Sequence, residues 1–123
     1  MISYLDQQVG ELVKKLKEIG KYENTLIIFS SDNGPTHIDH VDIDFFNSAG
    51  PFLNSENTVK GNLNEGGIRV PTIATWPKVI AAGSESNHPS IFYDYLATIS
   101  DLVGVTPPYK TDGISFLPTL KGK

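Results

Sequence analysis

The chain of 123 residues contains no cysteine and a single arginine, Arg69. The lack of cysteine excludes a disulfide framework and a thiolate metal site in this segment, and it leaves the cellular compartment undecided. The formal charge of −4 and the scarcity of arginine argue against a nucleic-acid surface. No apolar run approaches the roughly 18 residues that a membrane span needs, so we expect no span in this segment.

The first half of the chain carries clear helix and strand signals. Ser3 and Asp6 are spaced like a capping box, and Gly20 suits the end of the helix that this box would begin. The apolar residues between them fall on one helical face: Leu5, Val9, Leu12, Val13, Leu16 and Ile19. Continuous apolar runs at residues 25–30 and 71–76 predict strands covered on both faces, as in a parallel or mixed sheet.

The second half predicts a short strand over residues 88–93, followed by a helix that Asp94 caps and Gly104 ends. Residues 35–67 show little periodicity, and loops of this length are usually functional or disordered. Two helices and two or three strands form no closed architecture. We therefore expect the α/β class and a chain that is part of a larger domain.

Asp32 and Asn33 place a carboxylate beside an amide oxygen directly after the first strand. Such hard oxygen donors suit Ca²⁺ or Mg²⁺, although these cations take about six ligands and two residues cannot supply them all. The same residues with Gly34 also form an ordinary turn. Both interpretations remain open from the residues alone.

Further polar residues lie in the long irregular segment. Lys60 could contact an anion or be a solvated loop lysine, and Arg69 could pair with a carboxylate as a structural ion pair. Glu65 could hold a tight turn with the two glycines that follow it. Residues 37–44 combine two histidines with three aspartates, but their spacing fits no standard zinc pattern, and a solvated acidic surface explains them better.

Taken together and in order, these segments resemble the sulfatase family of the alkaline-phosphatase-like superfamily. The matching segments are Val9–Leu12, Asn24–Pro35, Lys60–Gly61, Glu65–Pro71, Trp76–Pro77 and Asp112–Pro118. The resemblance implies a partial alkaline-phosphatase-like α/β domain, with a mixed or parallel sheet flanked by helices. It further implies that residues 1–123 are the C-terminal portion of a sulfatase catalytic domain.

The resemblance also implies roles for particular residues. Asp32 and Asn33 match ligands of the active-site Ca²⁺, with Mg²⁺ as an alternative. Lys60 matches a catalytic lysine that holds a sulfate oxygen, and His37 joins it in substrate binding. The family hydrolyses sulfate esters with a formylglycine made from Cys or Ser in a Cys/Ser-x-Pro-x-Arg motif, which this chain lacks. We therefore expect the formylglycine in a missing N-terminal part, an inactive isolated chain, and a periplasmic or secreted parent protein.

Two other functions are compatible with the same residues. Relatives in the superfamily that bind softer transition metals commonly carry His where this chain has Asn33, so Asn33 favours a hard ion and a sulfatase. A phosphodiesterase or phosphonate hydrolase of the superfamily is one alternative, and the residue at the nucleophile position would discriminate it. A non-catalytic binding module is the other. The substrate, a sugar sulfate or an aryl sulfate, is left open.

Overall fold

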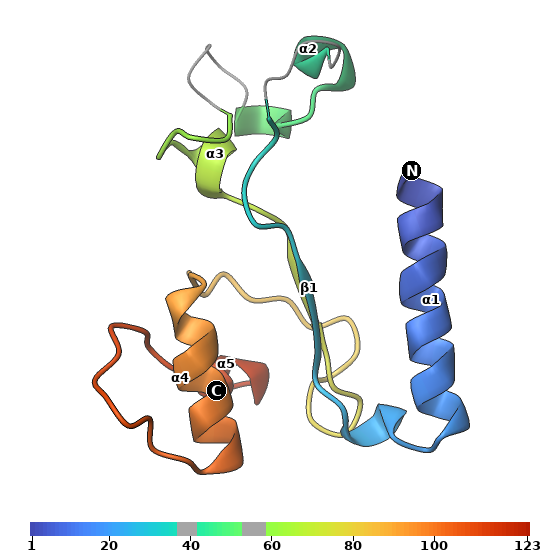
Figure 1. Cartoon of the computed structure of the whole chain (residues 1–123), viewed down its shortest axis with the longest axis vertical. Coiled ribbons are helices and arrows are strands. Elements are labelled where there is room, and N and C mark those ends of the chain that lie inside the picture. Colours follow the sequence, from blue (N-terminus) through green and yellow to red (C-terminus); the bar gives the residue numbers. More distant parts are fainter. Residues whose placement is uncertain (37–41, 53–58) are drawn as a thin grey trace. The chain divides into compact units, whose positions relative to one another are not determined.

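A computed structural model of the chain describes residues 1–36, 42–52 and 59–123 (Figure 1). The backbone forms two compact units, one made of residues 1–27 and 74–123 and the other of residues 28–73. Helical segments precede, separate and follow the two strands. In order they are α1 (Ile2–Glu18), the 3₁₀ turn η1 (Tyr22–Asn24), β1 (Ile27–Ser30), α2 (Ile43–Phe46), the 3₁₀ turn η2 (Gly50–Phe52), α3 (Glu65–Ile68), β2 (Thr72–Thr75), α4 (Tyr93–Val103) and α5 (Leu117–Leu120).

Helix α1 begins earlier than the sequence predicts. Its cap is Met1, which makes no side-chain capping bond, and Ser3 already lies inside the helix. The predicted capping box of Ser3 and Asp6 is therefore wrong, because a residue with helical neighbours on both sides cannot serve as the N-cap. The predicted apolar face is only partly covered in the described chain. Leu5 and Leu12 are 52% and 56% exposed, whereas Val9, Val13 and Leu16 are half-buried.

The end of α1 is confirmed. Gly20 has a φ of 67°, and its N–H donates to the carbonyl of Lys17 at 3.0 Å. The N–H of Lys21 donates to the carbonyl of Leu16 at 2.9 Å. These two bonds form a Schellman motif, which favours glycine because other residues rarely adopt a positive φ. Helix α4 ends in the same way at Gly104, whose φ is 69°.

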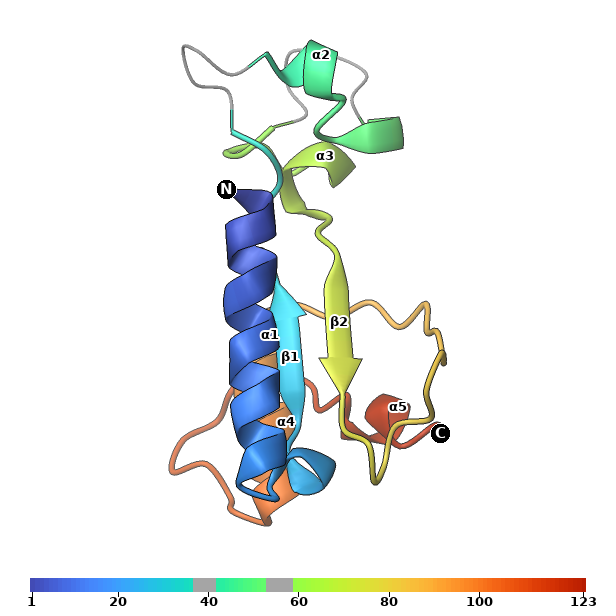
Figure 2. The same cartoon turned by 90° about the vertical axis from the view of Figure 1, so that its right-hand side faces the viewer.

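Strands β1 and β2 pair into a two-stranded sheet. Their arrows run in opposite directions in Figure 2, so the pair is antiparallel. The hydroxyls of Ser30 and Thr72 lie 2.9 Å apart across the pair, and the Ser30 hydroxyl also donates to the carbonyl of Pro71. The two predicted strands are thus confirmed in shortened form. A wholly parallel sheet is wrong, because residues 31–71 return the chain in the opposite direction, and the mixed sheet stays a prediction.

The predicted short strand at residues 88–93 is wrong. Asp94 accepts the backbone N–H of Ile91 at 2.9 Å, and this draws the preceding backbone into the start of α4. The helix begins at Tyr93, and its cap, Phe92, makes no side-chain capping bond. Asp94 therefore lies in the first turn rather than at the predicted cap position, while its carboxylate still binds a backbone N–H just before the helix.

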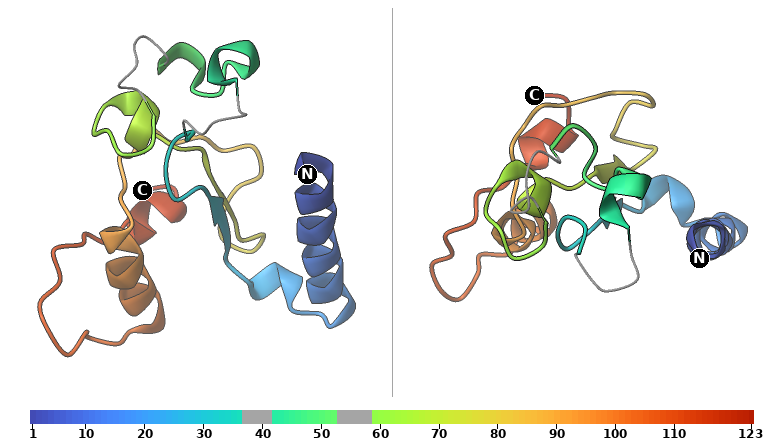
Figure 3. Two further views of the ribbon diagram at one scale, coloured as in Figure 1. Left: turned by 45° about the horizontal axis from the view of Figure 1, so that its top comes forward. Right: turned by 90° about the horizontal axis from the view of Figure 1, so that it is seen from above.

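Side chains on α4 hold the C-terminal segment. Asp94 Oδ1 accepts the N–H of Ile114 at 2.8 Å, and Thr98 Oγ1 accepts the N–H of Phe116 at 3.0 Å. Figures 1 and 3 show α5, which follows this segment, lying beside α4. Asp94 is 7% exposed and Thr98 is fully buried. These two polar residues are buried because the backbone groups of another segment satisfy them.

The apolar core of this contact is small. Phe116 and Leu117 are 7% and 4% exposed, and the Phe116 ring lies 5.7 Å from that of Tyr95. The predicted apolar face of α4 is largely uncovered by the described part of the chain, since Leu96 is 50% exposed and Val103 is 62% exposed.

Over the same described ranges, no helix has both the length and the apolar character required to cross a membrane.

Candidate functional site

The turn after β1 presents the two predicted metal ligands. Asp32 is exposed and Asn33 is half-buried. The Ser31 hydroxyl donates to the backbone carbonyl of Asn33 at 2.9 Å, and Asn33 Nδ2 donates to the carbonyl of Gly34 at 2.8 Å. The second bond fixes the amide plane and directs Oδ1 away from Gly34. No hydrogen bond engages Oδ1 in the described part of the chain, so this oxygen is available as a ligand.

The backbone of Lys60 joins the same turn. Its N–H donates to the carbonyl of Pro35 at 2.8 Å, two residues beyond Asn33. The Lys60 side chain is exposed, and no ion pair involves it among the residues that the structure describes. The structure therefore brings the loop of Lys60 to the predicted metal ligands and leaves its ammonium group accessible to an anion.

A glycine junction connects this turn with α3. The Gly34 N–H donates to the carbonyl of Gly67 at 2.9 Å, and Gly34, Gly66 and Gly67 are all buried. A methyl group built on Gly34 would overlap the carbonyl oxygen of Gly66, and one built on Gly67 would overlap that of Asn62. The two backbones approach this closely only because both positions lack a Cβ.

The predicted ion pair of Arg69 is confirmed. Its guanidinium lies 2.7 Å from the carboxylate of Glu65, at the other end of α3. It also lies over the Phe52 ring, 4.9 Å from the ring centre. Both partners of the ion pair are more than half exposed, so the pair contributes little to stability. The tight turn predicted at Glu65 is instead the first turn of α3, and the Glu65 carboxylate binds Arg69.

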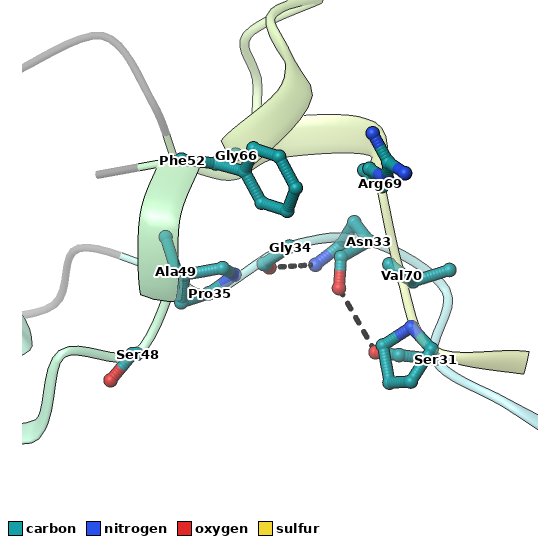
Figure 4. A pocket seen from close by; sticks show the side chains of 11 residues that line it. Ser31, Asn33, Gly34, Pro35, Ser48, Ala49, Phe52, Gly66, Arg69 and Val70 are labelled. Carbon is teal, nitrogen blue, oxygen red and sulfur yellow. Dashed lines mark hydrogen bonds between the residues drawn. The ribbon is translucent and has the colours of Figure 1, made fainter. Parts of the chain in front are cut away.

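An open concavity of about 720 Å³ lies beside Asn33 (Figure 4). Figure 4 shows Phe52 and Arg69 above Asn33, with Ser48 and Ala49 on the adjoining segment. The lining residues are Ser31, Asn33, Gly34, Pro35, Ser48, Ala49, Phe52, Gly66, Arg69, Val70 and Pro71. Asp32 and Lys60 are outside this lining, so the concavity adjoins the predicted ligands without containing all of them.

Comparison with known proteins decides the family. The model of the family described as Sulfatase matches residues 1–105, most of the chain. The chain belongs to the sulfatase family. It is 38% identical to the N-acetylgalactosamine-6-sulfatase of Mus musculus, over 97% of this chain and 22% of that protein. It is 35% identical to the steryl-sulfatase of Homo sapiens, over 99% of this chain and 21% of that protein.

A bacterial relative shows a similar likeness. The chain is 34% identical to the ulvan-active sulfatase of Formosa agariphila, over 97% of the chain and 20% of the relative. This sulfatase chain therefore spans about a fifth of the length of the curated relatives it matches. Membership of the family implies the alkaline-phosphatase-like α/β fold that the resemblance predicts.

The side chains of Asp32 and Asn33 can be compared with the donors that a calcium ion takes in proteins. Asp32 supplies an exposed carboxylate and Asn33 an orientated amide oxygen, and both are donors that Ca²⁺ prefers. No group of three or more His, Cys, Asp or Glu residues that could hold a metal occurs among residues 1–36, 42–52 and 59–123. His37, the predicted substrate-binding histidine, lies outside the described residues. The donor types of Asp32 and Asn33 therefore fit Ca²⁺, although two donors are fewer than the roughly six or more that this ion takes.

The isolated sulfatase chain should bind Ca²⁺ more weakly than the micromolar range. Two protein ligands leave most of the coordination shell to water, which competes with a flexible protein site. Isothermal titration calorimetry of the purified chain measures this. A micromolar or tighter site that disappears on Asp32→Ala would contradict the expectation, because the coordination would then be complete within the chain.

The contact between Gly34 and Gly67 is not predicted by the sequence. From the sequence, Gly34 is a turn residue and Gly67 belongs to a separate tight turn, although the two form one contact. The signal was weak, since a glycine in a polar loop usually marks a local bend. Only the three-dimensional structure shows that these glycines allow two distant backbones to meet.

Proposed function

We propose that the chain is the C-terminal portion of the catalytic domain of a sulfuric ester hydrolase. In this proposal Asp32 and Asn33 contribute two ligands to a Ca²⁺ site, with Mg²⁺ as an alternative ion, and Lys60 binds a sulfate oxygen. Family membership supports the reaction class. The supporting structural observation is the pair of backbone hydrogen bonds, Gly34 to Gly67 and Lys60 to Pro35, that joins the three sequence motifs at one place.

The chemistry of the residues agrees with this assignment. The bound cation would neutralise charge on the sulfate group. The Lys60 ammonium would add a second positive charge toward a sulfate oxygen, and fixed charges in a water-poor site are usually the largest catalytic contribution. Both charges would act on the oxygens of the sulfate group while it is transferred from the departing alcohol to the nucleophile. The nucleophile, a formylglycine in our proposal, would come from a part of the protein that precedes this chain.

The substrate is a sulfate ester in this proposal. The relatives are named for different sulfated compounds, an N-acetylgalactosamine 6-sulfate, a steryl sulfate and ulvan. The sulfate group is the part that those names share, and in this proposal Asp32, Asn33 and Lys60 act on that group. A sugar sulfate and an aryl sulfate therefore both remain within the proposal, and His37 is assigned to the same substrate contact.

Activity should appear in the full-length protein and not in the isolated chain. Without a Cys/Ser-x-Pro-x-Arg motif the chain cannot form the covalent intermediate through which the hydrolysis would proceed. The test is release of the phenol from an aryl sulfate, and of sulfate from sulfated sugars, with Ca²⁺ present. Hydrolysis by the isolated chain that persists after repurification would contradict this division. A full-length protein that hydrolyses phosphate diesters but no sulfate ester would contradict the proposed function itself.

A further inference from the structure

We infer that Gly34 and Gly67 are positioning residues that fix Lys60 relative to Asn33. The inference rests on the proposed function, because it concerns how the proposed calcium ligand and the proposed sulfate-binding lysine keep their spacing. Neither glycine touches a ligand in this account. Each acts through the backbone of a neighbouring residue, and each does so by having no side chain.

Gly67 governs the turn that carries Lys60. This turn is closed by the Asn62 N–H, which donates to the carbonyl of Val59 at 3.1 Å. Gly67 packs directly against it, because a Cβ on Gly67 would overlap the Asn62 carbonyl oxygen and lie 2.7 Å from that of Val59. Both neighbours are backbone atoms, which cannot rotate away as a side chain can. A methyl group at position 67 must therefore move the whole turn, including Lys60.

Gly34 governs the turn that carries Asn33. A Cβ at this position would overlap the Gly66 carbonyl oxygen, which is again a backbone atom. The Gly34 N–H bond to Gly67 at 2.9 Å would be lost or lengthened by the displacement. Because Asn33 is the adjacent residue, its amide oxygen would move with the turn.

The two glycines are required for space and not for backbone conformation. Six described glycines have a positive φ, and neither Gly34 nor Gly67 is among them. Alanine is therefore permitted by the local backbone at both positions, and the cost of the substitution is the displacement of the facing segment. A substitution far from the reacting atoms that displaces a catalytic group by about 1 Å can lower the rate roughly a hundredfold.

The experiment uses the full-length protein with Gly67→Ala, Gly34→Ala and the control Gly10→Ala. Gly10 has no atom within 4 Å of a built Cβ and no positive φ, so its substitution should leave every measurement unchanged. We expect Gly67→Ala to lower kcat roughly a hundredfold, with an unchanged Ca²⁺ titration by calorimetry. We expect Gly34→Ala to weaken Ca²⁺ binding roughly tenfold and to recover activity in excess Ca²⁺.

A further variant keeps the test decisive if the added methyl groups prevent folding, which circular dichroism would show. Asn62→Ala adds no atom. It removes the hydrogen bond that the Asn64 N–H donates to Asn62 Oδ1 at 2.9 Å, which stabilises the turn that carries Lys60. We expect it to lower kcat roughly tenfold with Ca²⁺ binding unchanged, because the loosened turn mispositions the lysine.

The outcomes separate this inference from the proposed function. A wild-type protein that hydrolyses no sulfate ester would overturn the proposed function. An active wild type with unaltered kcat in folded Gly67→Ala, or in Asn62→Ala, would leave the proposed function intact and overturn the positioning inference. A loss of Ca²⁺ binding in Gly67→Ala equal to that in Gly34→Ala would also overturn it, since both glycines would then serve only the general fold.

Discussion

Lys60→Ala in the full-length protein should lower kcat/KM for a sulfate ester about a hundredfold. The Lys60 ammonium is exposed and free of ion pairs within the described residues, so its charge is available to a substrate sulfate. Removing one preorganised charge contact of this kind typically costs about 3 kcal/mol of transition-state stabilisation. Steady-state kinetics on an aryl sulfate, with Ca²⁺ content measured in parallel, provide the comparison.

The matched control for this substitution is Lys14→Ala. Lys14 is an exposed lysine on α1, and its substitution by alanine removes the same charge from the protein as Lys60→Ala does. We expect Lys14→Ala to keep kcat/KM near the wild-type value, and both variants to keep the thermal midpoint, because an exposed lysine contributes little stability. Activity of Lys60→Ala within a few-fold of wild type would show that Lys60 is an ordinary surface lysine.

Asp94→Asn should lower the free energy of unfolding by about 2 kcal/mol. The carboxylate of Asp94 is 7% exposed and accepts N–H groups from Ile91 and Ile114. An asparagine side chain has one acceptor oxygen. The N–H of either Ile91 or Ile114 would therefore face the amide NH₂ group, which is itself a donor. Urea unfolding of the full-length protein measures the loss, and hydrogen exchange over residues 111–120 should become faster in the same variant.

The contribution of Asp94 should also depend on pH. Hydrogen bonds from the backbone of Ile114, and then of Ile91, lower the pKa of the Asp94 carboxyl, against the effect of desolvation and with a smaller contribution from His88. A carboxyl with a lowered folded-state pKa stabilises the fold above its unfolded pKa of about 4, and this stability is lost as the pH falls through the folded value. The difference in stability between the wild type and Asp94→Asn should therefore shrink as the pH falls below about 4 and disappear below the lowered folded-state pKa.

A control separates this effect from the titration of other carboxyls. Asp6 on α1 is exposed and makes no hydrogen bond through its side chain among the described residues, so Asp6→Asn should change the unfolding free energy by less than about 0.5 kcal/mol. A stability difference between wild type and Asp94→Asn that stays constant from pH 7 to pH 3 would contradict the assignment to the Asp94 charge.

The features that the sequence predicts correctly depend on near neighbours. The end of α1 at Gly20 and the end of α4 at Gly104 follow from glycine at a positive φ. The Arg69 ion pair joins residues four positions apart on one short helix. The turn at Asp32 and Asn33 follows directly from the end of an apolar run. Each of these signals and its structural consequence lie within a few residues of one another.

The features that the sequence does not predict depend on distant segments. The full burial of Thr98 requires the backbone of Phe116, which lies 18 residues further along the chain. The contact between Gly34 and Gly67 joins positions 33 residues apart, and neither glycine differs in type from an ordinary turn glycine. Tertiary contacts determine these features, and the composition and periodicity of the sequence do not predict such contacts.

The Schellman motifs at the ends of α1 and α4 have a consequence for the order in which the chain folds. Each motif is closed by a hydrogen bond between residues five apart, Lys21 to Leu16 and Val105 to Ser100. Rings this small close with little loss of chain entropy, and helix formation takes on the order of a microsecond or less. During synthesis, each Schellman motif could form as soon as the residue after its glycine had emerged. The length of α1 is therefore set before β1 and β2, which follow it in the chain, can pair, whereas α4 emerges only after both strands.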